Sequence, residues 1–275
     1  SRRGIMTISV GEWLLNIHRQ INKSVLIKKG RHWREDGISE RILEDLVGLF
    51  PSVDVATPFG VQKIAWDAFK LSGTPEYRAG DIAVLVKFSF ANGNEKEGVA
   101  FLEAKRTYPK SGEFDQLKIE QLEEHLSFTH AHRTLLYDYQ STEGHYHNLE
   151  LQYYCAACHY EHFSENYAST LSTEQAISLE DKSRDLLNYS LPLSYILTTR
   201  YLKGFELDYS PNAVKMAKGF LDENERGGVN FLLVAHVSFD MDLEPDPKKI
   251  LINDNCYRRI EPKPRNNDLD SGYHF

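Results

Sequence analysis

Three side chains in this sequence have the types and the spacing for metal-dependent chemistry: Asp81, Glu103 and Lys105. Two carboxylates held close together repel each other, and the pKa of one of them rises unless a cation lies between them. Mg²⁺ meets that need, because it prefers oxygen ligands, keeps several waters and commonly binds one or two carboxylates together with substrate phosphates. Such a cation polarises a phosphodiester, and a neighbouring lysine ammonium can orient the attacking water and neutralise developing charge.

A β-hairpin is expected to bring these side chains together. Residues 80–90, GDIAVLVKFSF, alternate as a strand does, and residues 99–105, VAFLEAK, form the return strand after an Asn-Gly turn. In an antiparallel hairpin the beginning of the first strand lies beside the end of the second, so Asp81 is placed near Glu103. Side chains two apart in a strand share a face, so the acidic and basic groups of the sequence EAK point the same way.

The composition bounds the class of protein. The chain has 275 residues, of which 41% are apolar and 26% charged, enough for a globular core in one domain or two closely packed ones. Its formal net charge of -8 argues against a protein that coats nucleic acid, so any phosphate-binding surface must be local. Three cysteines, and no apolar run near the ~18 residues of a membrane span, predict a cytoplasmic protein that does not bind membranes.

The remaining segments predict an α/β fold, with a mixed central β-sheet flanked by helices. The expected helices are 9–27, 36–50 and 113–128, the further strands are 132–140, 147–157 and 229–239, and residues 160–225 are expected to be mostly helical. We assign residues 7–158 to a core. Residues 159–275 are assigned to a mainly helical extension with one added strand and a loosely ordered tail.

Asp81, the hairpin and the sequence Glu103-Ala104-Lys105 resemble the signature of the PD-(D/E)XK, or restriction-endonuclease-like, nuclease superfamily. The resemblance covers residues 36–140, where the order of helix, strands and helix is similar to that superfamily's core. It implies Mg²⁺-dependent hydrolysis of phosphodiesters, with Mn²⁺ as a substitute. Asp81, Glu103 and the backbone carbonyl of Ala104 would bind the metal, and Lys105 would lie beside the attacking water.

The resemblance also implies two catalytic residues on helices. Many members carry a glutamate on the helix before the hairpin, and Glu40 fits that place as a third acidic site residue and metal ligand, with Glu44 in reserve. Many carry a glutamine on the helix after the E-x-K strand, where Gln121 fits best and Gln116 is the reserve. The chain departs from the pattern in having Gly80 where the superfamily often has proline.

Simpler interpretations compete with these assignments. Glu103 and Lys105 could form a solvated ion pair, which contributes ~0–1 kcal/mol at a surface. Asp81 could be an ordinary turn residue, Glu40 could merely suit the helix dipole, and Gln121 could be a surface amide. The joint occurrence of these residues on successive elements favours the active site.

A basic cluster precedes the helix that carries the candidate glutamate. The sequence KKGRHWRE, residues 28–35, contains Lys28, Lys29, Arg31 and Arg34 around an aromatic residue. Basic side chains interleaved with an aromatic suit the phosphate backbone of a nucleic acid. The cluster is equally consistent with a solvated loop, and both interpretations stay open.

Cysteines and histidines elsewhere in the chain offer further candidate ligands. Cys155 and Cys158, with histidines at 159 and 162, have the composition of zinc ligands, but the third cysteine, Cys256, is isolated. A structural zinc site usually takes four ligands as two pairs, so buried or free thiols are favoured. The histidines at 125, 130 and 132 are interpreted as polar surface residues.

The favoured function is a Mg²⁺-dependent DNA nuclease, whose context by family analogy is restriction or anti-phage defence more than repair. Cutting both strands of a duplex takes two active sites, which a twofold homodimer would supply. One alternative is a catalytically silent module of the same fold that binds partner proteins in a larger defence or repair complex. Another alternative keeps the chemistry and cleaves RNA.

Overall fold

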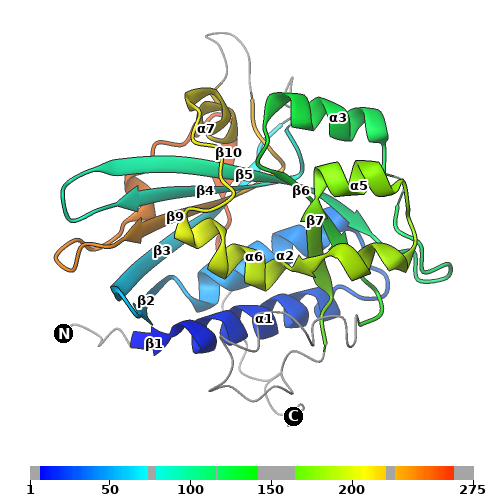
Figure 1. Ribbon diagram of the computed structural model, residues 1–275, viewed down its shortest axis with the longest axis horizontal. Helices are drawn as coiled ribbons and strands as arrows, with labels where there is room; N and C mark the ends of the chain where they lie inside the picture. Colours follow the sequence, from blue (N-terminus) through cyan, green and yellow to red (C-terminus); the bar gives the residue numbers. More distant parts are fainter. Residues whose placement is uncertain (1–6, 74–78, 116, 142–164, 221–226, 263–275) are drawn as a thin grey trace.

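The computed structural model describes residues 7–73, 79–115, 117–141, 165–220 and 227–262 of the chain (Figure 1). A ten-stranded mixed sheet runs through this part of the molecule, and helices cover both of its faces (Figure 1). Three of the strand pairs are parallel and the others are antiparallel. The expected α/β fold with a mixed, helix-flanked sheet is therefore confirmed.

The strands follow the order β1-β2-β3-β9-β4-β5-β6-β7-β8 across the sheet, and β10 pairs with β3 beyond this path. Their bounds are Thr7–Ser9 (β1), Ser52–Thr57 (β2), Gly60–Leu71 (β3), Ile82–Ser89 (β4), Glu95–Arg106 (β5), His132–Tyr137 (β6), Ala168–Ser172 (β7), Leu191–Pro192 (β8), Phe231–Ser238 (β9) and Tyr257–Arg259 (β10). The parallel pairs are β1 with β2, β4 with β9, and β5 with β6.

The helices form two layers, one on each face of the sheet. One layer contains α1, α2 and α6, and the other contains α3, α5 and α7 (Figure 1). The helical bounds are Val10–Ile27 (α1), Glu35–Leu49 (α2), Ile119–Phe128 (α3), Thr173–Leu179 (α5), Leu193–Thr199 (α6) and Pro211–Ala217 (α7), with 3-10 turns at Arg184–Tyr189 (η2), Tyr201–Lys203 (η3) and Pro247–Lys249 (η4). The apolar arc of α2 packs on the sheet, which fixes the start of this helix near the end of β5.

Strand β9 lies in the middle of the sheet, although its residues are remote in sequence from its neighbours. It pairs antiparallel with β3 and parallel with β4. All of its residues are buried, as expected for a nearly continuous apolar run covered on both faces. The strand expected at 229–239 is therefore present. It lies between β3 and β4 in the middle of the sheet, whereas it was expected in the extension outside the core.

The hairpin expected around the EAK sequence is confirmed. Strands β4 and β5 pair antiparallel, with Ile82 opposite Leu102, and a tight turn at Asn92 and Gly93 joins them. Beyond Leu102, β5 continues to Arg106 and pairs with β6. Strand β5 is therefore longer than β4 at this end of the hairpin. Its last residues, 103–106, have no β4 residue paired with them on that edge.

Other expectations have mixed outcomes. The strand expected at 132–140 is β6, whereas the strand expected at 147–157 lies outside the described residues. The described part of 160–225 contains the strands β7 and β8 as well as short helices, so it is less helical than expected. Within the described ranges, no helix combines the length and the apolar character needed to cross a membrane.

Candidate metal-binding active site

The candidate site lies at the end of the hairpin, where β5 extends past β4. Asp81 immediately precedes β4, and its backbone N–H donates to the carbonyl of Leu102 at 2.9 Å. Its carboxylate oxygen Oδ2 accepts a hydrogen bond from the backbone N–H of Ala104 at 2.9 Å, and Oδ1 accepts one from the side chain of Asn230 at 3.0 Å. These bonds hold the carboxylate beside the strand that carries Glu103.

Gly80 allows Asp81 to approach β5 this closely. Its φ is 138°, a conformation open to glycine but strained for residues with a side chain. A Cβ atom at this position would lie 2.9 Å from the carbonyl oxygen of Leu102. Proline fixes φ at about −65° and cannot adopt this backbone. The local geometry therefore favours glycine over proline at this position.

Glu103 and Lys105 form a buried ion pair on one face of β5. The Lys105 Nζ atom lies 2.8 Å from Glu103 Oε1, and the two side chains are only 12% and 5% exposed, respectively. A buried pair pays a desolvation penalty that a surface pair does not. The interpretation as a solvated ion pair at a strand end is therefore wrong.

Burial and neighbouring charges give the two carboxylates different proton affinities. Burial, and then the negative charge of Glu103, raises the pKa of Asp81 from 3.8 to about 7. Burial also acts to raise the pKa of Glu103, but His125 and Lys105 outweigh it and hold that pKa well below its usual range. Burial acts to lower the pKa of Lys105, but the charges of Glu103 and Asp81 outweigh it and raise that pKa. Without a metal, the site therefore relieves its excess negative charge by retaining a proton on Asp81.

The oxygen atoms at this site suit a hard divalent cation. In an extended strand the N–H and C=O of one residue point to the same edge, so the carbonyl of Ala104 faces Asp81, as its N–H does. Glu103 contributes the second carboxylate. In the described ranges, no group of three or more His, Cys, Asp or Glu side chains is arranged to hold a metal. Mg²⁺ commonly binds one or two carboxylates and completes its coordination with waters, so these oxygen ligands suit it. A closed zinc site usually takes four ligands that include cysteine or histidine.

The carboxylate that helix α2 brings to the site is Glu35, which the sequence interpretation missed. Its Oε1 atom accepts a hydrogen bond from the backbone N–H of Arg106 at 3.1 Å, and its charge acts on both Asp81 and Lys105. Burial raises the pKa of Glu35, while the charge of Lys105 lowers it. The acidic start of the helix, Glu-Asp, was the available signal.

The two glutamates proposed from the resemblance lie elsewhere on α2. Glu40 forms a salt bridge with Lys70 of β3, with 2.8 Å between Nζ and Oε2, and both side chains are about one third exposed. Glu44 is buried on the core side of the helix. The structure thus places Glu40 in an ion pair of its own, and it is Glu35 whose charge reaches Asp81 and Lys105.

Helix α3 contributes two side chains that contact Glu103. Gln121 Nε2 donates to Glu103 Oε1 at 3.4 Å, which places the predicted glutamine at the site. One turn later, His125 Nε2 lies 3.6 Å from Glu103 Oε2. Gln116, the reserve, lies outside the described residues. Helical spacing of four residues puts both side chains on the same face.

The histidines near α3 differ from the expected surface residues. His125 and His132 are 3% and 2% exposed, and their rings stack with centroids 4.8 Å apart. Burial, and then the neighbouring His125, lowers the pKa of His132 to about 3. The Nδ1 atom of His132 bonds to the hydroxyl of Thr173 at 2.7 Å. Only the side chain of His130, which is 76% exposed, fits the surface interpretation.

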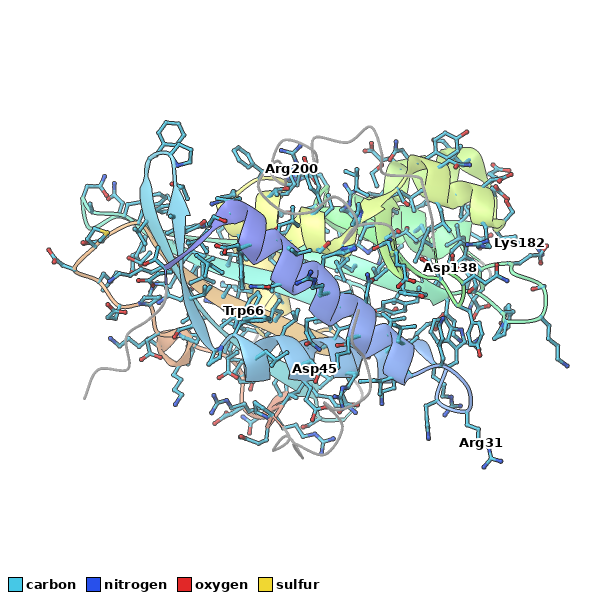
Figure 2. All side chains as sticks on the ribbon, turned by 90° about the horizontal axis from the view of Figure 1, so that it is seen from below. Arg31, Asp45, Trp66, Asp138, Lys182 and Arg200 are labelled. Atoms are coloured by element: carbon cyan, nitrogen blue, oxygen red, sulfur yellow. The ribbon has the colours of Figure 1, made fainter. Side chains whose placement is uncertain are left out.

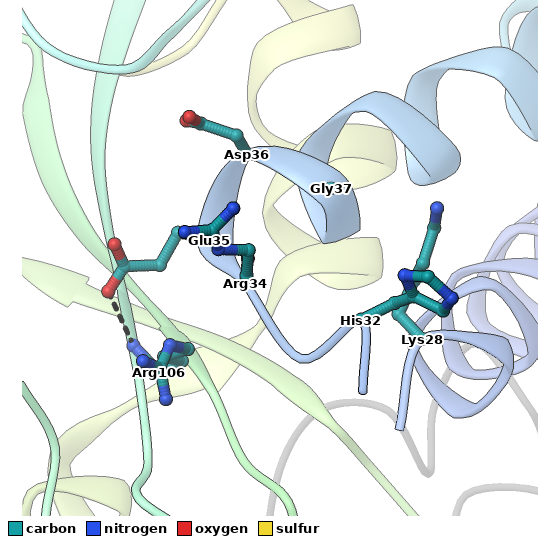
Figure 3. Close-up of a pocket in the computed structure, with 7 residues that line it drawn as sticks. All are labelled: Lys28, His32, Arg34, Glu35, Asp36, Gly37 and Arg106. Carbon is teal, nitrogen blue, oxygen red and sulfur yellow. Dashed lines mark hydrogen bonds between the residues drawn. The ribbon is translucent and has the colours of Figure 1, made fainter. Parts of the chain in front are cut away.

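The basic cluster is divided by the structure into residues with different surroundings. Lys28 and Arg34 line a pocket of about 470 Å³ next to Glu35 (Figure 3). The ammonium of Lys29 lies instead over the ring of Tyr167, 4.4 Å from its centroid. Arg31 is exposed and extends away from the fold (Figure 2). Proximity in sequence therefore does not give these cations a common function.

The candidate zinc ligands at 155–162 lie outside the described residues. The remaining cysteine, Cys256, is buried among the apolar residues that pack with α7, and its Sγ donates to the carbonyl of Gly219 at 3.5 Å. Its burial agrees with the interpretation as a packing residue.

Comparisons with protein-family models, with curated proteins and with solved structures find no match to this chain. Its function must therefore be inferred from the residues and the geometry of this site.

Proposed function

We propose that this chain is a Mg²⁺-dependent DNA nuclease of the PD-(D/E)XK class, with Mn²⁺ able to replace Mg²⁺. The single observation that supports this most is the buried group of Asp81, Glu103 and Lys105 at the open end of one hairpin. Structural ion pairs also perturb pKa values, but burying a second carboxylate beside Glu103 has a folding cost that a functional site explains. The element order α2, β2, β3, β4, β5, α3, β6, in which strands follow one helix and precede the next, further supports the resemblance.

Each residue has a role that follows from its contacts. Asp81 and Glu103 hold the cation, with the Ala104 carbonyl as a third ligand on the same edge of β5. When bound, Mg²⁺ would polarise the phosphodiester and lower the pKa of a bound water. Lys105, which keeps its proton because its pKa is raised, stabilises the negative charge that develops on the phosphate.

The surrounding residues act through this group. Gln121 and His125 contact Glu103 and restrict its carboxylate to one orientation. Glu35 lies on the other side of Lys105 and the Arg106 backbone, so it holds the ammonium near the strand end. When neighbouring side chains fix the orientation of the metal ligands in this way, the metal is bound in a defined geometry.

Incubation of the purified protein with plasmid DNA and Mg²⁺ or Mn²⁺ tests the proposal. Glu103→Gln and Lys105→Ala should each reduce cleavage by about a hundredfold or more, as removal of a charge-stabilising group does. Asp242→Asn is a matched control, because this exposed carboxylate follows the opposite end of β9 from the site. Cleavage that survives in both site variants would exclude this active site.

The same assay separates the alternatives. Cleavage of structured RNA but not of DNA would establish the same chemistry on the other nucleic acid. Wild-type protein that cuts neither, with either metal, would support a silent interaction module. By analogy, we propose restriction or anti-phage defence as the context. There the chain would act in the cytoplasm as a homodimer, together with partner proteins of a defence system.

A further inference from the structure

The pocket beside the candidate site has an unexplained excess of positive side chains. Lys28, Arg34 and Arg106 line the pocket, whose volume is about 470 Å³ (Figure 3). Within the described part of the chain, none of these three cations forms a salt bridge. Cations gathered around one cavity repel each other unless an anion joins them.

The pocket adjoins the candidate active site through Glu35 and the end of β5. Arg106 follows Lys105 directly on β5, and its backbone N–H binds Glu35 at 3.1 Å. Glu35 lines the pocket and also acts on the charge of Lys105. Because neighbouring residues of a strand point to opposite faces, the Arg106 side chain lies on the face of β5 opposite to Lys105. A DNA strand that left the site around the free edge of β5, past Glu35, would therefore reach Arg106 and Lys28.

The two carboxylates of the pocket neutralise its three cations only in part. The carboxylate of Glu35 is directed to the strand and accepts the Arg106 backbone bond (Figure 3). Asp36 extends away from Lys28 and His32 (Figure 3). The guanidinium of Arg106 lies over the ring of Tyr108, 4.8 Å from its centroid, and this cation–π contact restricts the side chain. The lining therefore carries three cations, Lys28, Arg34 and Arg106, against two carboxylates, and its balance of charge favours an anionic ligand.

We propose that this pocket binds a phosphate of the DNA strand adjacent to the phosphate that is cut. The inference rests on the proposed nuclease function and names its substrate more closely. A substrate must then carry at least two phosphates, one at Lys105 and one at Lys28 and Arg34. Arginine and lysine bind phosphate oxygens through charge-assisted hydrogen bonds, which suits these side chains. A small diester with a single phosphate reaches only the first position.

The test compares two substrates in the presence of Mn²⁺: a short single-stranded DNA and bis-(p-nitrophenyl) phosphate. Lys28→Ala and Arg34→Ala should each lower kcat/KM for the DNA by about tenfold, the size expected for one lost charge-assisted contact. Neither variant should change the hydrolysis of bis-(p-nitrophenyl) phosphate. Arg31→Ala is the matched control, because Arg31 is exposed on the same turn but does not line the pocket.

A binding measurement keeps the proposal testable if no cleavage is seen. Fluorescence anisotropy of labelled oligothymidylate in Ca²⁺ should show weaker binding for Lys28→Ala and Arg34→Ala. The slope of log affinity against log salt should fall by about 0.7 for each single-strand phosphate contact removed. Arg31→Ala should keep the wild-type affinity and slope.

Two results would contradict the proposal that this pocket binds a phosphate. In the first, both pocket variants bind and cut DNA as Arg31→Ala does. In the second, both variants remain folded but lose activity on DNA and on bis-(p-nitrophenyl) phosphate to the same extent. Failure of the nuclease function has a different signature, since the wild-type protein would then cut neither substrate, and the anisotropy experiment alone would decide whether the pocket binds a phosphate chain.

Discussion

Replacing Asp81 by asparagine should stabilise the metal-free protein above neutral pH while removing its response to Mg²⁺. In the folded protein, burial and the charge of Glu103 raise the pKa of Asp81 to about 7 from 3.8. Asparagine has nearly the same shape, and its carbonyl oxygen can still accept the backbone N–H of Ala104. The substitution therefore removes the buried charge and keeps the bond from Ala104, while the side-chain amide of Asn230 must turn its oxygen towards the new NH₂ group.

The magnitude follows from the pKa difference. Each pKa unit corresponds to about 1.4 kcal/mol, so the shift from 3.8 to about 7 sets an upper bound of ~4 kcal/mol on the cost of ionised Asp81. Asp81 binds its proton more tightly in the folded state, so folding stability falls as pH rises from 3.8 and the full cost applies above about pH 7. After relaxation of the variant, we expect a gain of ~2 kcal/mol above pH 7, shrinking towards zero at the acidic end.

The assay is urea unfolding, followed by tryptophan fluorescence, across this pH range with a chelator present. Addition of Mg²⁺ should then raise the stability of the wild-type protein, since a ligand that binds only the folded state stabilises it, and should leave Asp81→Asn unchanged. Asp242→Asn, at an exposed position, is the control. A variant that is less stable than the wild type throughout this range, or equally stable, would refute the buried-charge reasoning.

Three further substitutions test the surroundings of the site. Gly80→Ala should lower the free energy of unfolding by about 1–3 kcal/mol in chemical denaturation, because its Cβ would press on Leu102 at a positive φ, whereas Gly93→Ala, which meets open space, should cost less. Glu35→Gln should lower the rate of DNA cleavage more than Glu40→Gln does, and equal effects in a steady-state assay would count against Glu35. His125→Ala should weaken Mn²⁺ binding by about tenfold or more in titration calorimetry, and an equal loss in His130→Ala would contradict the contact with Glu103.

The hairpin could be predicted from sequence because its signals are local. Alternating apolar residues, an Asn-Gly turn and a second apolar run specify two paired strands, and pairing then fixes which ends meet. That was enough to bring Asp81, Glu103 and Lys105 together. Gln121 followed from the position of the next helix, which contacts Glu103 as expected.

The remaining parts of the site depend on contacts between distant segments. Strand β9 carries Asn230 to Asp81, but no local pattern shows that a strand this late in the chain inserts between β3 and β4. The resemblance led to Glu40 as the glutamate on this helix, yet sequence alone cannot say which turn of a helix lies opposite a strand end. Glu35 was missed for that reason, and His125 because a polar residue in a short amphipathic helix resembles a surface residue.

The most direct test of the central claim is the anomalous scattering of crystals grown with Mn²⁺. We predict a manganese peak between the carboxylates of Asp81 and Glu103, within bonding distance of the Ala104 carbonyl. The ammonium of Lys105, now 2.8 Å from Glu103 Oε1, should move away from that oxygen as the metal takes its place. The absence of a peak at saturating Mn²⁺, with the ion pair unchanged, would contradict the assignment of this site as a metal-dependent active centre.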